Sequence, residues 1–311
     1  MTYRINDTAD YHKQELATLG WEWTVCNMLE NRESPCRRIL KIDQSYGLHL
    51  FDFLEEKTGF GDVHRLIEVG GGYGFLMRDF LSRKGDLAPV MVDISPVLLG
   101  EQKKCLKGHK VEFIQDDFFN LEKSFLQSFS MAVFNENLGD FPTVCDLKPE
   151  ILSAASGSDP LLIEIRKFHD KYQLPLPVQT GYTVNLGALR VLESLCEAGI
   201  PRIFLSEHSC ESRVPLKWAD LIEIESTGHP ERIKLKGHDE FTIQFSHLEK
   251  IANYYDYKCL RGPFADYLEP EMSDEIYFIM KSRSCHKEEH EVIRHFLEDL
   301  FKYEYLLLCK S

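Results

Sequence analysis

Residues 65–81 read Arg-Leu-Ile-Glu-Val-Gly-Gly-Gly-Tyr-Gly-Phe-Leu-Met-Arg-Asp-Phe-Leu, and this stretch decides the fold. Its apolar start predicts a buried strand, the glycines predict a tight turn, and the residues from Phe75 onward predict a helix. Glycine adopts positive φ without strain and lets a ligand lie against the backbone. A strand, a glycine turn and a helix in this order predict a cofactor site in a Rossmann-like fold.

The spacing of the turn narrows the choice of cofactor. Glu68 stands two residues before Gly70-x-Gly72-x-Gly74, whereas dinucleotide folds favour Gly-x-Gly-x-x-Gly to receive a pyrophosphate. S-adenosylmethionine has no phosphate but carries a cationic sulfonium and an amino-acid end, so an acid beside the turn suits it. We therefore predict S-adenosylmethionine as cofactor, with S-adenosylhomocysteine as product and Glu68 near the amino group. A glycine turn without a ligand is the alternative.

Composition limits the partners. The chain has 311 residues, 36 basic and 50 acidic, and a formal charge of −14. A field of this sign repels phosphate backbones, so we expect no nucleic-acid partner and favour a cationic or neutral substrate. No segment is long and apolar enough to suggest a membrane span, the N-terminus has no secretory pattern, and nine unpatterned cysteines indicate reduced thiols. We predict a cytoplasmic protein.

Apolar runs alternate with helical stretches along the chain, which indicates a mostly parallel sheet with helices on both faces. The predicted strands are 65–69, 89–93, 111–115, 131–135 and 202–206. Later strand-like pieces are 231–236 and 241–245, and a helix is predicted at 246–255. An antiparallel edge hairpin is predicted from 257–261 and 275–281. The fold class is thus an α/β, Rossmann-like class I methyltransferase fold with a seven-stranded sheet.

The predicted organisation has three parts. A helical N-terminal cap (1–60) contains helices at 8–31 and 44–57, with Leu16, Leu19, Trp23 and Cys26 on one face of the first. The cofactor-binding domain (61–283) carries an inserted segment at about 157–184, which holds an apolar run (160–166) and a proline-broken stretch. The tail, 284–311, is predicted as one amphipathic helix over 286–308.

Three further positions complete the predicted cofactor site. Asp93, with Ile94 beside it, ends the second strand 25 positions after Glu68, where such folds place an acid for the ribose hydroxyls. Capping of the following helix is the alternative for Asp93, although Ser95 is a better cap. After the third strand, Asp116 or Asp117 is expected to accept from the adenine amino group while Phe118 packs on the ring. A simple loop role is the alternative for these acids.

The fourth and fifth strands supply the predicted acceptor side. Asn135 and Glu136 follow the fourth strand, at the edge of the sheet where ligands bind. Glu136 is predicted to hold a cationic or hydroxyl substrate or to take its proton, and turn stabilisation is the alternative. His208 follows the fifth strand as a candidate general base, with a loop histidine as the alternative.

A metal site is not predicted. The histidine-rich tail suggests one, but its lysines and glutamates indicate a solvated helix face; the residues concerned are Cys285, His286, His290 and His295.

At these motifs the chain resembles the MidA-like methyltransferases, the family that includes mitochondrial complex I assembly arginine methyltransferases. The family's acid-x-Gly-x-Gly-x-Gly turn is followed by Ser-x-x-Leu-x-x-x-Gln, matched by Ser95, Leu98 and Gln102. Its Asn-Glu-x-x-Asp-x-x-Pro motif is matched by Asn135, Glu136 and Pro142.

The resemblance covers about residues 39–262 and weakens on the acceptor side. Gly139 stands where the family has its acid, and Asp140 comes one position later. The segments 43–47, 202–208 and 241–248 are similar to family segments but altered. The resemblance implies use of S-adenosylmethionine, while the family's arginine methylation is left open by these departures.

Together the residues and the resemblance predict methyl transfer. We expect direct in-line displacement from the sulfonium to a nitrogen or oxygen of a small molecule or of a protein side chain such as arginine. The N-terminal helices and the inserted segment are expected to close over the acceptor, and a homodimer is possible. The alternatives are a catalytically silent S-adenosylmethionine-binding assembly or scaffold protein and, disfavoured by the glycine spacing, a dinucleotide-dependent oxidoreductase.

Overall fold

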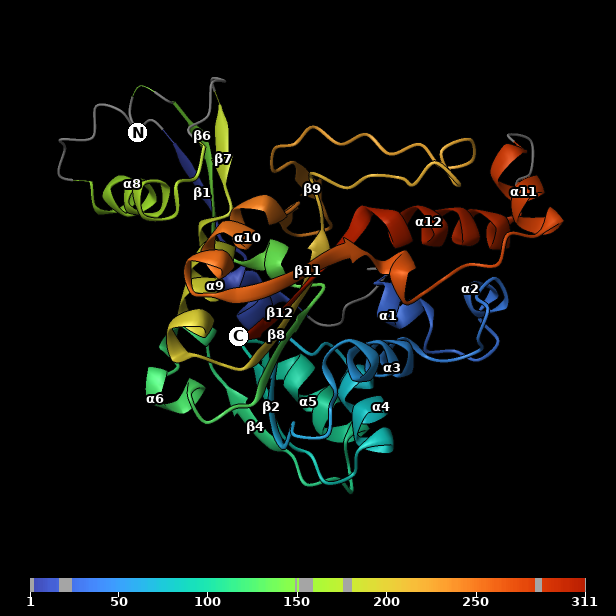
Figure 1. Ribbon diagram of the computed structural model, residues 1–311, viewed down its shortest axis with the longest axis horizontal. Helices are drawn as coiled ribbons and strands as arrows, with labels where there is room; N and C mark the ends of the chain where they lie inside the picture. The colour runs from blue at the N-terminus through green and yellow to red at the C-terminus, as the bar shows by residue number, and fades with distance from the viewer. Residues whose placement is uncertain are drawn as a thin grey trace.

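A seven-stranded sheet forms the centre of the molecule (Figure 1). The computed structural model describes residues 3–16, 24–148, 150, 159–175, 181–282 and 287–310. The strand order is β11-β12-β8-β5-β2-β3-β4. The strands are β2 (Arg65–Val69), β3 (Ala88–Asp93), β4 (Glu112–Gln115), β5 (Met131–Asn135), β8 (Arg202–His208), β11 (Tyr257–Pro263) and β12 (Tyr303–Lys310). Neighbouring strands from β8 to β4 are parallel, and β12 runs antiparallel to both β8 and β11. The predicted fold class is confirmed.

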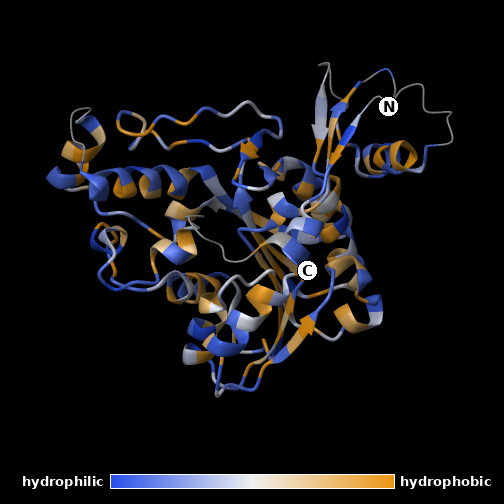
Figure 2. Ribbon diagram, turned by 180° about the vertical axis from the view of Figure 1, so that it is seen from behind, coloured by the Kyte–Doolittle hydropathy of each residue, from blue (hydrophilic) through white to orange (hydrophobic). Residues whose placement is uncertain are grey.

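The central strands form the sheet because both of their faces are buried. Ile67 and Leu66, neighbours on β2, are fully buried in two different hydrophobic cores, one on each face of the sheet. Strands covered on both faces read as continuous apolar runs, which is the pattern seen in the sequence. Figure 2 shows hydrophobic ribbon concentrated along these strands and on the inner sides of the helices.

Helices cover both faces of the sheet. Buried side chains of α3 (Tyr46–Thr58), α4 (Phe75–Arg83) and α12 (Glu288–Lys302) belong to one core, and those of α9 (Leu186–Ala198) and α10 (Phe245–Tyr254) to the other. The remaining helices of four residues or more are α1 (Val25–Met28), α2 (Pro35–Arg38), α5 (Pro96–Cys105), α6 (Lys123–Leu126), α8 (Pro160–Tyr172) and α11 (Asp274–Lys281). No helix in the described part of the chain is long and apolar enough to cross a membrane.

The C-terminal prediction was wrong in two places. The segment predicted as a strand at 275–281 is helix α11, capped by Ser273, whose hydroxyl accepts from the Ile276 amide at 3.2 Å. The tail is not one helix, because α12 ends at Lys302 and the chain continues as β12. β12 pairs with β8 and β11 along its length, so the continuous apolar run at its centre is buried between two strands. An apolar run of this kind has no periodicity that separates a buried strand from a buried helix.

The N-terminal region also differs from its prediction. The predicted helix at 44–57 is confirmed by α3, but 8–31 is not one helix. It contains a short π-helix (η1, Tyr11–Glu15) and α1, and Leu16 between them is extended. Leu19 and Trp23 lie outside the described residues.

A second sheet lies apart from the first. Strand β1 (Arg4–Asn6) pairs with β6 (Thr143–Leu147), which pairs with β7 (Tyr182–Val184). Figure 1 shows this sheet beside α8 at one corner of the molecule. The apolar run at 160–166 lies in helix α8, and the predicted insertion at about 157–184 remains a prediction. A two-stranded hairpin, β9 (Arg232–Lys234) and β10 (Asp239–Phe241), precedes α10.

Candidate cofactor and acceptor site

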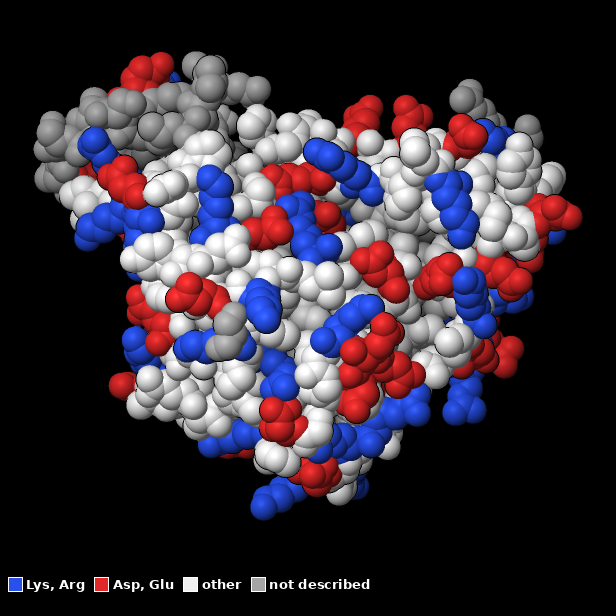
Figure 3. Space-filling view, in the orientation of Figure 1, with Lys and Arg blue, Asp and Glu red and all other residues white. Residues whose placement is uncertain are grey.

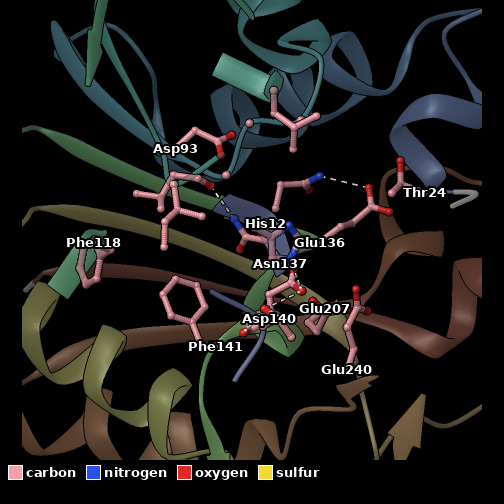
Figure 4. Close-up of a pocket in the computed structure, with 18 of the residues that line it drawn as sticks. His12, Thr24, Asp93, Phe118, Glu136, Asn137, Asp140, Phe141, Glu207 and Glu240 are labelled. Carbon is pink, nitrogen blue, oxygen red and sulfur yellow. Dashed lines mark hydrogen bonds and ion pairs between the residues drawn. The ribbon is translucent and has the colours of Figure 1, made fainter. Parts of the chain in front are cut away.

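A cavity of about 480 Å³ opens at the carboxyl ends of the parallel strands. A volume of this order is typical of a small-molecule or cofactor site. All the residues predicted for the cofactor except Gly74 contribute to its lining, as do Asn135, Glu136 and His208. Figure 4 shows how labelled side chains from the N-terminal segment, the loops after the strands and the β9–β10 hairpin converge on it.

The glycine turn has the backbone that its sequence requires. Gly70, Gly72 and Gly74 have φ values of 64°, 51° and 83°, in the region that favours glycine. A Cβ on Gly70 would also overlap the amide nitrogen of Asn137, which donates to the carbonyl of Val69. The turn thus needs glycine both for its φ angles and for its contact with the loop after β5.

Glu68 is the most unusual acid in the cavity. Its side chain is buried, and its Oε2 has no hydrogen-bond partner among the described residues. Burial, with the nearby charge of Asp93, raises the pKa of Glu68 to about 8. A buried carboxylate oxygen without a donor, at the wall of a cavity, is suited to a cationic or N–H-bearing ligand. The amino-acid end of S-adenosylmethionine fits this requirement.

Asp93 is held rigidly at the end of β3. Its Oδ1 accepts from the Ser95 amide at 2.8 Å and its Oδ2 from the Gln102 side chain at 2.7 Å. Each carboxylate oxygen has two lone pairs, so both oxygens retain acceptor capacity for a diol. Ser95, not Asp93, caps α5 through the Leu98 amide at 3.3 Å. Ile94 lines the cavity beside Asp93, and burial raises the pKa of Asp93 to about 6.

The two acids of the loop after β4 accept hydrogen bonds from within that loop. Asp117 caps the 3-10 helix η2 (Phe118–Asn120) by accepting from the Phe119 amide at 3.0 Å. Asp116 accepts from the Asp117 amide and from the Asn120 side chain, both at 2.7 Å. The geometry thus gives both acids the loop role that was the alternative, while both still line the cavity.

The phenylalanines that line the cavity include two that were not predicted, Phe119 and Phe141, besides the predicted Phe118. Phe118 is buried and packs edge-on against Phe134, with ring centroids 5.1 Å apart. Phe119 is 37% exposed and meets Phe141 edge-on at 5.6 Å. These two rings also line the cavity, so they join Phe118 as surfaces against which a flat ring can pack.

Glu136 joins the acceptor side to the N-terminal segment. Its Oε2 accepts from the Val25 amide at 2.7 Å and its Oε1 from the Cys26 amide at 3.2 Å, so the carboxylate sits at the start of α1. Asn135 donates to Glu136 at 3.1 Å and accepts from Ser206 at 2.9 Å. Burial raises the pKa of Glu136 to about 7, against the lowering effect of these donors. The contacts favour the stabilising alternative over direct proton transfer.

His208 lies in an ionic environment that does not suit a general base. Its imidazole lies 3.5 Å from Glu207 and 3.9 Å from Asp299, and it stacks near the Tyr303 ring. Burial alone would lower the pKa of His208, but the two carboxylates raise it to about 9. A histidine protonated at neutral pH cannot accept a proton, so the structure favours an ion-pair role.

The cavity wall is strongly acidic. Nine carboxylates line it: Asp7, Glu68, Asp93, Asp116, Asp117, Glu136, Asp140, Glu207 and Glu240. Its arginine, Arg190, forms a two-bond ion pair with Glu164, at 2.6 and 2.5 Å. On the face drawn in Figure 3, acidic and basic side chains are mixed. Low-dielectric walls of one sign focus the field and attract cations.

The structure explains why the acid of the family motif is displaced. Gly139 lies in the 3-10 helix η3 (Leu138–Asp140), where a Cβ would come within 3.1 Å of the Phe241 carbonyl, and its amide donates to Glu207 at 3.0 Å. A side chain at 139 is therefore poorly accommodated. Asp140 reaches the cavity instead, where its carboxylate lies 2.8 Å from His12 Nε2.

Several lining residues were not found from the sequence. They come from the N-terminal segment, the loop after β5, the β9–β10 hairpin and β12, and they include His12, Thr24, Asn137, Phe141, Glu240 and Tyr303. Asp140 was noticed only as a departure from the family motif. Spatial neighbours that lie more than 90 positions apart in the sequence cannot be identified from local spacing. No local signal could therefore have grouped these residues.

Comparisons with known proteins support the fold. No family profile matches the chain, and no curated protein matches its sequence. A solved structure of an uncharacterized protein from Burkholderia thailandensis aligns with a TM-score of 0.56 and 13% identity, covering 99% of this chain and 88% of that one. A plantazolicin methyltransferase, BpumL, in complex with S-adenosylhomocysteine aligns with a TM-score of 0.44 and 11% identity, covering 92% of this chain and 89% of that one. A glycopeptide N-methyltransferase, MtfA, in complex with S-adenosylmethionine aligns with a TM-score of 0.41 and 12% identity, covering 85% of this chain and 94% of that one. The likeness to the Burkholderia structure, whose TM-score is above 0.5, supports the Rossmann-like fold.

Proposed function

We propose that this chain is an S-adenosylmethionine-dependent methyltransferase that acts on a nitrogen or oxygen of a cationic or neutral acceptor. The observation that carries the proposal is the buried, unpartnered Glu68 oxygen beside three positive-φ glycines, with Asp93 fixed at the end of the next strand. Glu68 offers an unpartnered acceptor oxygen for an ammonium group, and Asp93 offers acceptors for two hydroxyls.

The residues of the chain contribute alignment and exclusion of water. When bound, the cofactor supplies an electrophilic methyl group on a sulfonium, which needs no enzyme nucleophile. The N-terminal residues Thr24, Cys26 and Asn27 line the cavity and are tied to its floor through Glu136, so they shield the reacting atoms from water. Holding two reactants in line can supply several kcal/mol of the barrier reduction. The acidic wall favours a cationic acceptor, and the protein-arginine acceptor of the family resemblance is consistent with this charge.

Calorimetric titration with S-adenosylmethionine tests the cofactor assignment. Asp93→Asn removes the charge that faces the ribose site while keeping the side-chain shape, and Asp86→Asn removes an exposed carboxylate as the matched control. We expect the first variant to weaken binding by about tenfold or more, since a hydrogen bond to a charged group contributes about 1.5–3 kcal/mol. The control should bind as the wild type does. Absence of binding by the wild-type protein, or equal affinity of Asp93→Asn, would contradict the proposal.

A second candidate is a catalytically silent S-adenosylmethionine-binding scaffold protein. The observation that favours it is the engagement of Glu136 in capping α1, because the best-placed acid of the acceptor side then stabilises the fold. Incubation with a labelled methyl donor and cell extract separates the two candidates. Label transferred above the level of the Asp93→Asn variant supports the enzyme, whereas binding without transfer supports the scaffold.

A further inference from the structure

Two histidines and two acids from distant segments meet at one side of the cavity. His12 comes from η1, Asp140 from η3, and His238 and Glu240 from the β9–β10 hairpin. Asp140 Oδ1 lies 2.8 Å from His12 Nε2 and 3.6 Å from His238 Nε2, and His238 Nε2 lies 3.2 Å from Glu240 Oε1. One ligand atom from each of His12, Asp140 and His238 falls within 4.8 Å of the other two.

We propose that His12, Asp140 and His238 bind one divalent transition-metal ion, zinc by preference. Two imidazole nitrogens with a carboxylate oxygen are a donor set for zinc and its neighbours, whereas magnesium and calcium prefer all-oxygen sites. In a tetrahedral site with metal–ligand bonds of about 2.0–2.2 Å, ligand atoms lie roughly 3.3 Å apart. Asp140 Oδ1 lies 2.8 Å from His12 Nε2 and 3.6 Å from His238 Nε2, which is close to this value, so small side-chain shifts would admit the ion.

The surroundings hold these ligands in place. The His238 side chain is 4% exposed, and its ring stacks on Tyr11 with centroids 4.3 Å apart. The buried Thr8 hydroxyl lies 3.3 Å from Asp140 Oδ1 and 2.8 Å from the Asp140 carbonyl oxygen. It therefore holds both the backbone and the carboxylate of Asp140 in position. Partners of this kind, one shell outside the ligands, orient metal-binding side chains and tune affinity.

The position of the cluster gives the ion a role. His12, Asp140 and Glu240 line the same cavity as the glycine turn, and Figure 4 shows His12 between Asp93 and Asp140. An ion here would face a bound acceptor and could hold its oxygen or nitrogen while lowering the pKa of a bound hydroxyl. This role rests on the proposed function, but binding of the ion does not. The ion would also fasten the N-terminal segment to the hairpin across the cavity.

Titration of the full chain with cobalt and zinc tests the site. Under reducing conditions that keep thiols from oxidising, we expect one equivalent of cobalt to give the visible d–d absorption of a tetrahedral site, and one equivalent of zinc to displace it. His238→Ala and Asp140→Asn should each weaken zinc binding by more than about 100-fold, since loss of an outer-shell partner alone costs 10–100-fold. His109→Ala, at an exposed histidine, is the matched control and should bind as the wild type does.

The outcomes separate this proposal from the methyltransferase proposal. A wild-type protein that shows no cobalt absorption, or only absorption that survives in His238→Ala, overturns the metal site and leaves an ion pair between Asp140 and the histidines. Because the wild-type titration needs no variant, a variant that fails to fold does not affect this conclusion. Stoichiometric zinc binding without affinity for S-adenosylmethionine would support the metal site and overturn only the methyltransferase proposal.

Discussion

Glu68 makes the stability of this protein depend on pH in a direction opposite to that of most acids. Its pKa is raised from 4.5 to about 8 by burial and by Asp93. The folded state therefore retains a proton that the unfolded chain loses above pH 4.5, so the contribution of Glu68 is fully present below about 4.5 and is lost as pH rises to about 8. Between pH 5.5 and 7.5 this linkage amounts to a loss of roughly 2–3 kcal/mol in the free energy of unfolding.

Glu68→Gln removes this titration while keeping the shape of the side chain. We expect urea unfolding to show that the difference in stability between wild type and variant changes by roughly 2–3 kcal/mol between pH 5.5 and 7.5, because the wild type becomes less stable relative to the variant at the higher pH. A constant cost of burying the amide cancels in this difference. Glu271→Gln, at an exposed acid, is the matched control and should follow the wild type. Parallel pH profiles of wild type and Glu68→Gln would show that Glu68 is ionised in the folded protein, and the reasoning would fail.

Three further predictions concern the glycine turn and two charged side chains. Gly70→Ala forces a Cβ onto Asn137 at a φ of 64°, so we expect a loss of about 1–3 kcal/mol in thermal or urea unfolding, and an unchanged free energy would contradict the contact. Arg261, 17% exposed, pairs with three glutamates at 2.6–3.0 Å, so Arg261→Met should destabilise the protein by roughly 3 kcal/mol, measured in the same way; a loss under about 1 kcal/mol would mean that water screens the glutamates. Asp299→Asn should lower the pKa of His208, about 9 in the wild type, by about one unit in an NMR titration, and an unmoved titration would remove Asp299 as the cause.

The residues predicted for the cofactor could be proposed from the sequence because they lie in local patterns. Glu68 and Asp93 lie at the carboxyl ends of β2 and β3, and parallel strands bring these ends to one edge of the sheet. The strands themselves were found because burial on both faces produces continuous apolar runs. The residues of each pattern lie within a few positions of each other, so the patterns can be recognised in a single sequence.

The acceptor half depends on long-range contacts and could not be predicted in this way. Nothing near Glu136 shows that its carboxylate caps a helix more than 100 residues earlier in the chain. Likewise, β1 forms a strand by pairing with β6. The apolar run of β12 is compatible with either a buried strand or a buried helix, so the sequence alone does not decide between them. Tertiary partners decide these segments, and local propensity does not.

The displaced acid at Asp140 connects these two halves. Because β10 lies against Gly139, the loop after β5 carries its acid one residue later, where it faces His12 and His238. The segments that supply those histidines are the N-terminus and the hairpin, and both lie outside the strand-end motifs that indicate the cofactor. This side of the cavity is therefore built from acids and histidines of distant segments, which meet only in the folded chain.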